Sequence, residues 1–183
     1  MQEEELTDEG MIARIQQGEQ RYLELLIRKY YDDIYYFCSY KIGDRQQAYD
    51  CTQETFLKLT RSIHGYKERQ KFKGYLFSIA RNVCMDYFRG KRPVVTDPEE
   101  LLSLTADKDA FGKMELAQVL VQALKGLTAE QREVVVLRFY HDFKLKEIAM
   151  IVGVPLPTAK SRLKRGMAKL KEILEEEGVT HEG

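Results

Sequence analysis

The segment from Glu147 to Lys171, EIAMIVGVPLPTAKSRLKRGMAKLK, constrains the fold of this chain more than any other stretch. It begins with an apolar helical run, Gly153 predicts a turn, and a second helix is expected after Pro157. From Thr158 to Lys171 there are six Lys/Arg residues and no Asp or Glu, although the formal net charge of the whole chain is zero. Two helices joined by a short glycine-containing turn, with positive charge concentrated on the second, are typical of a helix-turn-helix.

The overall composition predicts an all-α protein made of two small helical domains. The chain has 183 residues, 44% of them hydrophobic, and only four prolines. No run approaches the roughly 20 apolar residues that a membrane span needs, so we expect no membrane insertion. The N-terminal sequence MQEEEL is acidic where a signal peptide would be basic, which predicts a cytoplasmic protein.

The cysteines and histidines indicate no special chemistry. Cys38, Cys51 and Cys84 are odd in number and widely spaced, as are the three histidines. This predicts buried thiols in a reducing compartment, with no disulfide framework, no metal site and no cofactor. No nucleophile–base pair or phosphate-binding loop stands out, so we assign no catalytic residue and expect no enzyme.

Helical periodicity predicts three helices in an N-terminal domain of residues 1–92. The first covers Gln20–Ile42, and the second runs from the N-cap Asp44 to about Ile63. The third extends from about Phe72 to Arg89. We expect its buried stripe to consist of Phe72, Leu76, Ile79, Val83 and Tyr87.

A flexible acidic linker is expected next, over residues 93–115. It holds two prolines, and between Asp97 and Glu115 six acids face two lysines. A C-terminal domain with the helix-turn-helix follows over residues 116–178. Within it, Thr128 and Gln131 predict a capping box at the start of a helix from Ala129 to Tyr140.

A second basic surface is expected over Arg61–Arg92, where nine Lys/Arg residues face two acids and aromatic residues are interleaved. Cations with aromatics suit unpaired DNA, whose bases need flat faces or pockets. We place the base pocket in the loop Ser62–Lys73, because loops carry adaptable polar groups. Leu57 is a further oddity, an apolar residue on an otherwise polar stripe. A single exposed leucine means little by itself.

Several segments resemble the bacterial extracytoplasmic-function sigma factors, group IV of the sigma-70 family. They are DCTQETFLKL (50–59), FKGYLFSIARNVCMD (72–86) and the 147–171 segment, and LTAEQREVVVLR (127–138) resembles the family's lead-in to its helix-turn-helix. The segments occur in the family's order and at its spacing. Together they cover most of the chain between residues 20 and 175.

The resemblance implies that the two domains are sigma regions 2 and 4. Its implied partners are the RNA polymerase core enzyme, promoter DNA in duplex and melted form, and an anti-sigma factor. On the core enzyme, the contacts would be the clamp helices of the beta-prime subunit and the beta flap. The implied role is initiation of transcription at specific promoters in stress responses, in the bacterial cytoplasm and at the nucleoid through RNA polymerase.

The resemblance also implies three sets of site residues. The set that docks on the core polymerase is Asp50, Gln53, Glu54 and Leu57. The set that reads the minus-thirty-five element is Thr158, Lys160, Ser161, Arg162, Lys164 and Arg165. The set that recognises and opens the minus-ten element is His64, Tyr66, Lys73, Arg81, Asn82, Asp86, Arg89 and Arg92, with a base of the non-template strand flipped into the Ser62–Lys73 loop.

The chain departs from the family pattern at three places. Lys144 stands where Ser or Thr often caps the first helix of the motif, Pro157 replaces a frequent Gly, and the usual Trp near Tyr75 is absent. Pro is accepted in the first turn of a helix, so the helix start is preserved. Two alternatives stay open: a stand-alone helix-turn-helix transcriptional regulator with an unrelated N-terminal sensor domain, and, less favoured, an enzyme that acts on nucleic acid.

Overall fold

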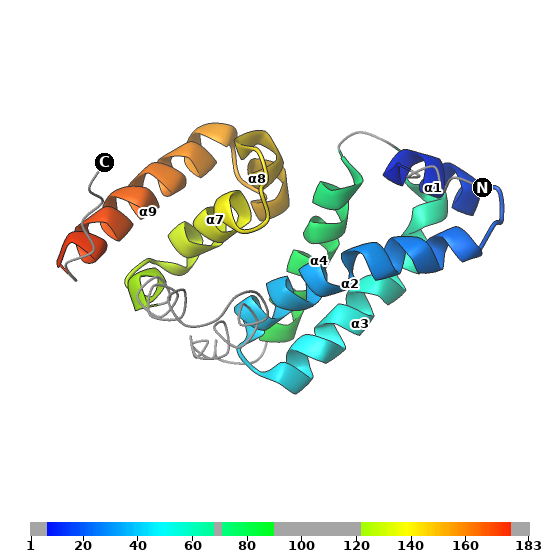
Figure 1. Ribbon diagram of the computed structural model, residues 1–183, viewed down its shortest axis with the longest axis horizontal. Helices are drawn as coiled ribbons and strands as arrows, with labels where there is room; N and C mark the ends of the chain where they lie inside the picture. Colours follow the sequence, from blue (N-terminus) through cyan, green and yellow to red (C-terminus); the bar gives the residue numbers. More distant parts are fainter. Residues whose placement is uncertain (1–6, 68–70, 90–121, 177–183) are drawn as a thin grey trace, which may run out of the picture. The chain divides into compact units, whose positions relative to one another are not determined.

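The computed structural model describes residues 7–67, 71–89 and 122–176 (Figure 1). In these ranges the chain forms helices joined by short turns and contains no strand, which confirms the all-α prediction. The chain divides into two compact units, Met1–Val94 and Val95–Gly183. The expected linker and Arg92 lie outside the described residues.

The described part of the N-terminal unit contains four α-helices and one 3-10 turn. These are α1 (Asp8–Gln16), α2 (Arg21–Ile42), α3 (Arg45–Ser62), the turn η1 (Ile63–Gly65) and α4 (Phe72–Phe88). The predicted N-cap of α3 is present, because Oδ1 of Asp44 accepts a hydrogen bond from the amide of Gln47 at 2.8 Å. The sequence analysis did not predict α1, which begins at the N-cap Thr7.

The core of this unit lies between α2, α3 and α4, which pack against one another. The ring of Phe37 on α2 meets the ring of Phe77 on α4 edge-on, with centroids 5.2 Å apart. The predicted buried stripe of α4 is partly wrong, since Ile79 and Tyr87 are only half-buried while Phe77, Ala80 and Cys84 are fully buried. The reason is that α4 packs against two helices at once, which widens and rotates its buried face.

The three cysteines meet in this core, one from each helix. Cys38, Cys51 and Cys84 are all buried as free thiols, and the sulfurs of Cys84 and Cys38 are 3.8 Å apart. Hydrogen bonds to Cys38 and Cys51, together with burial, raise the pKa of the Cys84 thiol well above its usual value. The Cys84 thiol is therefore protonated, and the three buried cysteines pack as small apolar side chains.

The C-terminal unit contains α7 (Ala129–Phe139), α8 (Leu145–Val152) and α9 (Leu156–Glu176), preceded by a helical turn over residues 122–125. The predicted capping box is present: the Gln131 amide donates to Oγ1 of Thr128, and the Thr128 amide donates to Oε1 of Gln131, both at 3.2 Å. Gly153 ends α8 with φ +70°.

The two departures at helix starts have simple local solutions. A lysine side chain cannot accept a hydrogen bond, but the backbone amide of Lys144 donates to Oε2 of Glu147 at 2.7 Å, which satisfies one amide at the start of α8. Helix α9 begins at Leu156, one residue before Pro157. Pro157 therefore lies in the first turn, where a missing N–H costs no intrahelical hydrogen bond.

Close packing of α7 and α9 fixes the position of the second helix of the motif. Gly166 on α9 lies so near α7 that an added Cβ would be 3.0 Å from Cγ2 of Val135. Leu170 packs with Val135 in the same buried cluster. The guanidinium of Arg132 also donates to three carbonyls, those of Leu124, Lys125 and Leu127, at 2.8 to 3.2 Å, which holds the preceding helical turn against α7.

Candidate nucleic-acid interface

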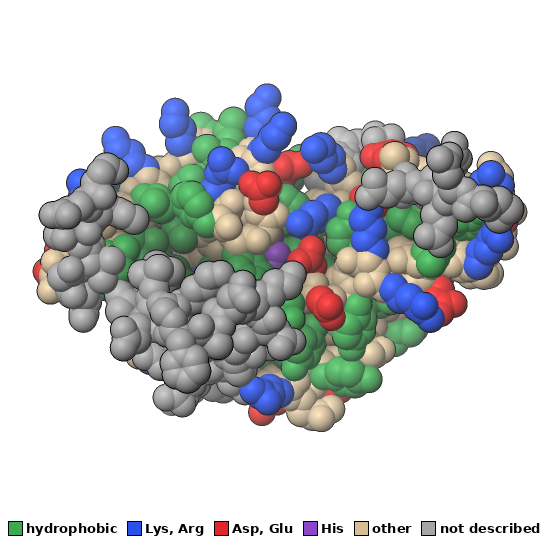
Figure 2. All heavy atoms as spheres, in the orientation of Figure 1, with side chains coloured by type: hydrophobic (Ala, Val, Ile, Leu, Met, Phe, Trp, Pro, Cys, Tyr) green, Lys and Arg blue, Asp and Glu red, His purple; other side chains and the backbone are tan. Residues whose placement is uncertain are grey.

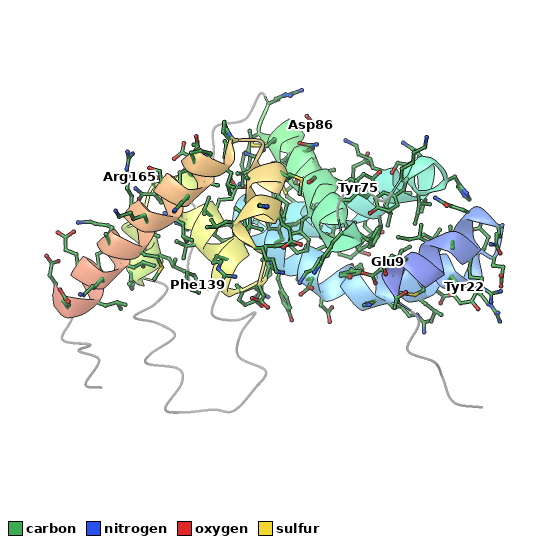
Figure 3. All side chains as sticks on the ribbon, turned by 90° about the horizontal axis from the view of Figure 1, so that it is seen from above. Glu9, Tyr22, Tyr75, Asp86, Phe139 and Arg165 are labelled. Carbon is green, nitrogen blue, oxygen red and sulfur yellow. The ribbon has the colours of Figure 1, made fainter. Side chains whose placement is uncertain are left out.

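Helix α9 separates a core side from a basic side. Ala159, Gly166 and Leu170 are buried, and Leu163 packs beside them. This spacing leaves Lys160, Lys164 and Arg165 exposed, with Thr158, Ser161 and Arg162 half-exposed next to them. Lys and Arg side chains stand out along α9 in the space-filling view (Figure 2), and Arg165 projects outward in Figure 3. The structure thus brings all six predicted residues together on one helix.

The positive charge of this face is available to a partner. Within the described ranges, no acidic side chain forms an ion pair with Lys160, Arg162, Lys164 or Arg165. Further along α9, Lys169 pairs with Glu172 at 2.9 Å and Lys171 pairs with Glu175 at 3.7 Å. The unneutralised cations are therefore concentrated on the N-terminal half of α9.

A cleft of about 520 Å³ opens between α3 and α4 in the N-terminal unit. Its lining residues are Lys58, Ser62, Tyr75, Ile79, Asn82, Met85, Asp86 and Arg89. Three of them, Asn82, Asp86 and Arg89, were predicted for the minus-ten set. Ser62 begins the loop in which the base pocket was predicted. The remaining lining residues were not predicted, and Ile79 was assigned to the core. Tyr75 and Asp86 both lie on α4 in Figure 3.

Two cations that line the cleft pair with one carboxylate. Oδ2 of Asp86 is 3.4 Å from Nζ of Lys58, and Oδ1 of Asp86 is 3.3 Å from Nη1 of Arg89. Each oxygen of Asp86 thus has its own positively charged neighbour. We interpret Asp86 as a group that orients Lys58 and Arg89 rather than as a direct contact to a phosphate, which it would repel.

The turn after α3 adjoins the cleft through the ring contact between Tyr66 and Tyr75. The hydroxyl of Tyr75 donates to Oγ of Ser62 at 2.7 Å, and the ring of Tyr66 packs on the ring of Tyr75 with centroids 4.8 Å apart. His64 is exposed on η1. Among the described residues of the predicted Ser62–Lys73 pocket loop, only Ser62, the last residue of α3, lines the cleft, so a base pocket within the loop stays a prediction.

Lys73 and Arg81 of the predicted minus-ten set do not line the cleft. Nζ of Lys73 is 3.5 Å from Oδ2 of Asp33 on α2 and lies 5.8 Å from the centroid of the Phe77 ring. Arg81 is half-buried. The structure therefore divides the predicted set into residues of the cleft, residues of the adjoining loop and these two outlying cations.

The predicted docking residues share one face of α3. Asp50, Gln53 and Leu57 are exposed and Glu54 is half-buried. Leu57 is 49% exposed, so its apolar side chain lies at the surface of this face. Tyr49 is also exposed and lies four residues before Gln53, so it adjoins this face.

Two negative observations complete the description of these surfaces. Among the described residues, no group of three or more His, Cys, Asp or Glu side chains is placed to hold a metal ion. In the same ranges, every helix is too short or too polar to cross a membrane.

Comparison with known proteins gives a single family. The profile of Sigma-70 region 2 matches residues 26–94, and that of Sigma-70, region 4 matches residues 123–172. The chain is 30% identical over 176 residues to the ECF RNA polymerase sigma factor SigW of Bacillus subtilis, covering 89% of this chain and 94% of the relative. The chain belongs to the extracytoplasmic-function sigma factors of the sigma-70 family. The resemblance stated from the sequence is thus confirmed.

Other relatives agree with this assignment. The sigma factor is 28% identical to the ECF RNA polymerase sigma factor SigX of Bacillus subtilis, over 83% of each chain. Its fold matches that of the sigma factor RpoE of Bartonella quintana, which was solved in complex with the anti-sigma factor NepR. The TM-score is 0.65 at 21% sequence identity, and the match covers 83% of this chain and 96% of RpoE. The region 2 match contains the cleft and the α3 face, and the region 4 match contains the helix-turn-helix up to residue 172.

Proposed function

We propose that this sigma factor directs core RNA polymerase to specific promoters and assists strand opening there. The observation that carries the proposal is that two different kinds of surface, each suited to a different form of DNA, occur in two separate units. One is a helix with an unneutralised basic face, and the other is a cleft that combines aromatic, apolar and cationic side chains. The first suits intact duplex and the second suits unpaired bases.

In region 4, α9 is proposed to lie in the major groove of the minus-thirty-five element. A single helix fits a groove of about 12 Å width, and in a helix-turn-helix the N-terminal residues of the second helix contact base edges. Thr158, Ser161 and Arg162 lie in that part of α9, flanked by Lys160, Lys164 and Arg165. We assign sequence reading and phosphate contacts to these six residues together.

In region 2, the cleft is proposed to receive an unstacked base of the minus-ten element. Tyr75, Ile79 and Met85 offer a flat ring and apolar contacts, while Ser62 and Asn82 offer hydrogen-bonding groups for a base edge. Lys58 and Arg89 suit the backbone phosphates. Extracting a base from the stack costs a few kcal/mol, and contacts in the cleft would offset that cost.

The protein is proposed to act by binding alone. Strand opening then follows because the sigma factor binds melted DNA more tightly than duplex, which shifts the equilibrium without covalent chemistry. The α3 face, with Asp50, Gln53, Glu54 and Leu57, is proposed to dock on the clamp helices of the beta-prime subunit. Region 4 is proposed to contact the beta flap. The setting would be the bacterial cytoplasm, with the protein at the nucleoid through RNA polymerase.

An anti-sigma factor is proposed as a further partner. The support is family membership, together with the fold shared with RpoE, whose structure contains the anti-sigma factor NepR. Domain boundaries near residues 92 and 116, as predicted from the sequence, would let such a partner engage the two sigma regions separately.

Run-off transcription with core polymerase tests the proposal. A library of genomic promoters should give specific transcripts only when core polymerase and the sigma factor are both present. The sequences upstream of the aligned start sites should share a minus-ten and a minus-thirty-five element. The protein alone should bind promoter duplex weakly. Tight, sequence-specific duplex binding by the protein alone, with no effect on core polymerase, would favour a stand-alone regulator.

A further inference from the structure

Gln16, the last residue of α1, reaches the turn that connects α3 to α4. Its Nε2 atom lies 3.0 Å from the carbonyl oxygen of Ile63 and 3.0 Å from that of Tyr66. An amide nitrogen carries two hydrogens, so it can donate one to each carbonyl. These two carbonyls bracket His64 and Gly65, and α1 packs directly against η1. One side chain thus ties together both ends of the turn.

The turn that Gln16 holds supports the wall of the cleft. Ser62, which lines the cleft, immediately precedes Ile63. At the other end of the turn, the ring of Tyr66 packs on Tyr75 and meets Phe72 edge-on, with centroids 5.9 Å apart. A shift of this turn would therefore move Ser62 and the support of Tyr75 together.

Helix α1 is itself firmly held, so Gln16 has a rigid base. Oδ1 of Asp8 accepts from Nζ of Lys29 at 2.8 Å, and Oδ2 of Asp8 accepts from the hydroxyl of Tyr30 at 2.5 Å. Met11, Ile12 and Ile15 are buried. Burial, followed by the hydrogen bond to Asp8, raises the pKa of Tyr30 far above its usual value, which keeps the phenol protonated as a donor.

We propose that Gln16 is a positioning residue for minus-ten recognition, which fixes the Ile63–Tyr66 turn so that the cleft accepts the correct base. This inference rests on the proposed function of the cleft. Neither α1 nor Gln16 falls within the region 2 match, which begins at residue 26. The base itself is contacted by the cleft, and Gln16 acts through the two carbonyls.

The test is the base preference of the holoenzyme on fork-junction DNA. The DNA carries the promoter found by run-off transcription. A series of variants places each of the four bases in turn at each unpaired minus-ten position. Gln16→Met keeps the side-chain length but removes both donors. Because each hydrogen bond is worth about a factor of five, the loss of both should lower the affinity ratio between the best and the worst base by at least about fivefold. Binding to minus-thirty-five duplex and to core polymerase should not change.

Two further variants separate positioning from general damage. Gln17→Met is the matched control, an exposed neighbour given the same substitution, and should retain the wild-type ratio. Gln16→Lys retains donors that can reach both carbonyls and should preserve most of the ratio. Its added charge acts on all bases alike and cancels in the ratio. If Gln16→Met does not fold, as judged by circular dichroism, Gln16→Ala replaces it.

The outcomes are distinct. A wild-type ratio in folded Gln16→Met overturns the proposal, and so does an equal loss of affinity for all four bases, which would indicate a merely structural role. If the wild-type holoenzyme itself shows no base preference, the proposed function of the cleft fails instead. A ratio that falls in Gln16→Met and is retained in Gln16→Lys and Gln17→Met supports the positioning role.

Discussion

The hydroxyl of Tyr75 donates a hydrogen bond of 2.7 Å to Oγ of Ser62, joining the first turn of α4 to the last residue of α3. Both residues line the cleft between these helices. The bond links the two sides of the cleft, and the ring of Tyr75 packs at a tilt against that of Tyr66. A polar link of this kind constrains the site without closing it.

Replacing Tyr75 with Phe removes this hydrogen bond and keeps the ring. We expect open-complex formation to fall about fivefold, the equivalent of one hydrogen bond, with little effect on minus-thirty-five duplex binding. Ser62→Ala should have a similar effect, and the double variant should be no worse than either single one, because both remove the same interaction. Additive losses in a permanganate footprinting assay would show that the two residues act independently.

Leu57→Asp should abolish binding to core polymerase and leave the fold intact. On a docking face, the substitution removes the apolar contact of the leucine with the polymerase. It also buries a carboxylate in the interface, which costs several kcal/mol. Leu25→Asp is the matched control, since Leu25 on α2 is exposed to 48% against 49% for Leu57. Pull-down with core polymerase distinguishes them. Recovery of Leu57→Asp at wild-type level would exclude this face.

Long, capped helices were predictable from the sequence. Helices α2, α3, α4 and α7 each repeat an apolar stripe over several turns, and the caps at Asp44 and Thr128 mark two of their starts. Helix α1 was missed because its nine residues contain only three that are buried, too few for a clear period. Its role also depends on contacts with Ile63 and Tyr66, far away in the sequence.

The face of a helix was harder to predict than its existence. Ile79 fits the apolar period of α4, yet it lines the cleft, because the two neighbours of α4 bury Phe77, Ala80 and Cys84 instead. The cleft combines Lys58 and Ser62 from α3 with residues spaced three or four apart on α4. That combination depends on how the helices pack, which a single-helix pattern does not contain.

Gly166→Leu should destabilise the C-terminal unit. Even a Cβ at this position would be 3.0 Å from Cγ2 of Val135, so a larger side chain must push α9 away from α7. We expect a loss of about 2 kcal/mol in the free energy of unfolding, typical of overpacking. Ala168→Leu places the same side chain on an exposed position of α9 and should be nearly neutral. Equal urea midpoints for the two variants would contradict this packing argument.

Lys164→Ala should weaken binding to minus-thirty-five duplex without altering its sequence preference. Lys164 is exposed, and within the described residues no carboxylate pairs with it. A lysine ammonium is a point charge without the fork geometry of arginine, so a phosphate is its natural partner. The slope of log K against log salt concentration is negative, and loss of one phosphate contact should make it shallower by about 1.

Lys171→Ala is the control for this charge removal. Lys171 lies on the same helix two turns further on, but its ammonium is 3.7 Å from Oε1 of Glu175 and is already partly neutralised. Its loss should leave the salt slope near the wild-type value, as measured by fluorescence anisotropy of holoenzyme on labelled duplex. Equal changes in slope for the two variants would mean that the cations of α9 act as a diffuse charge. A changed sequence preference in Lys164→Ala would assign Lys164 to a base edge.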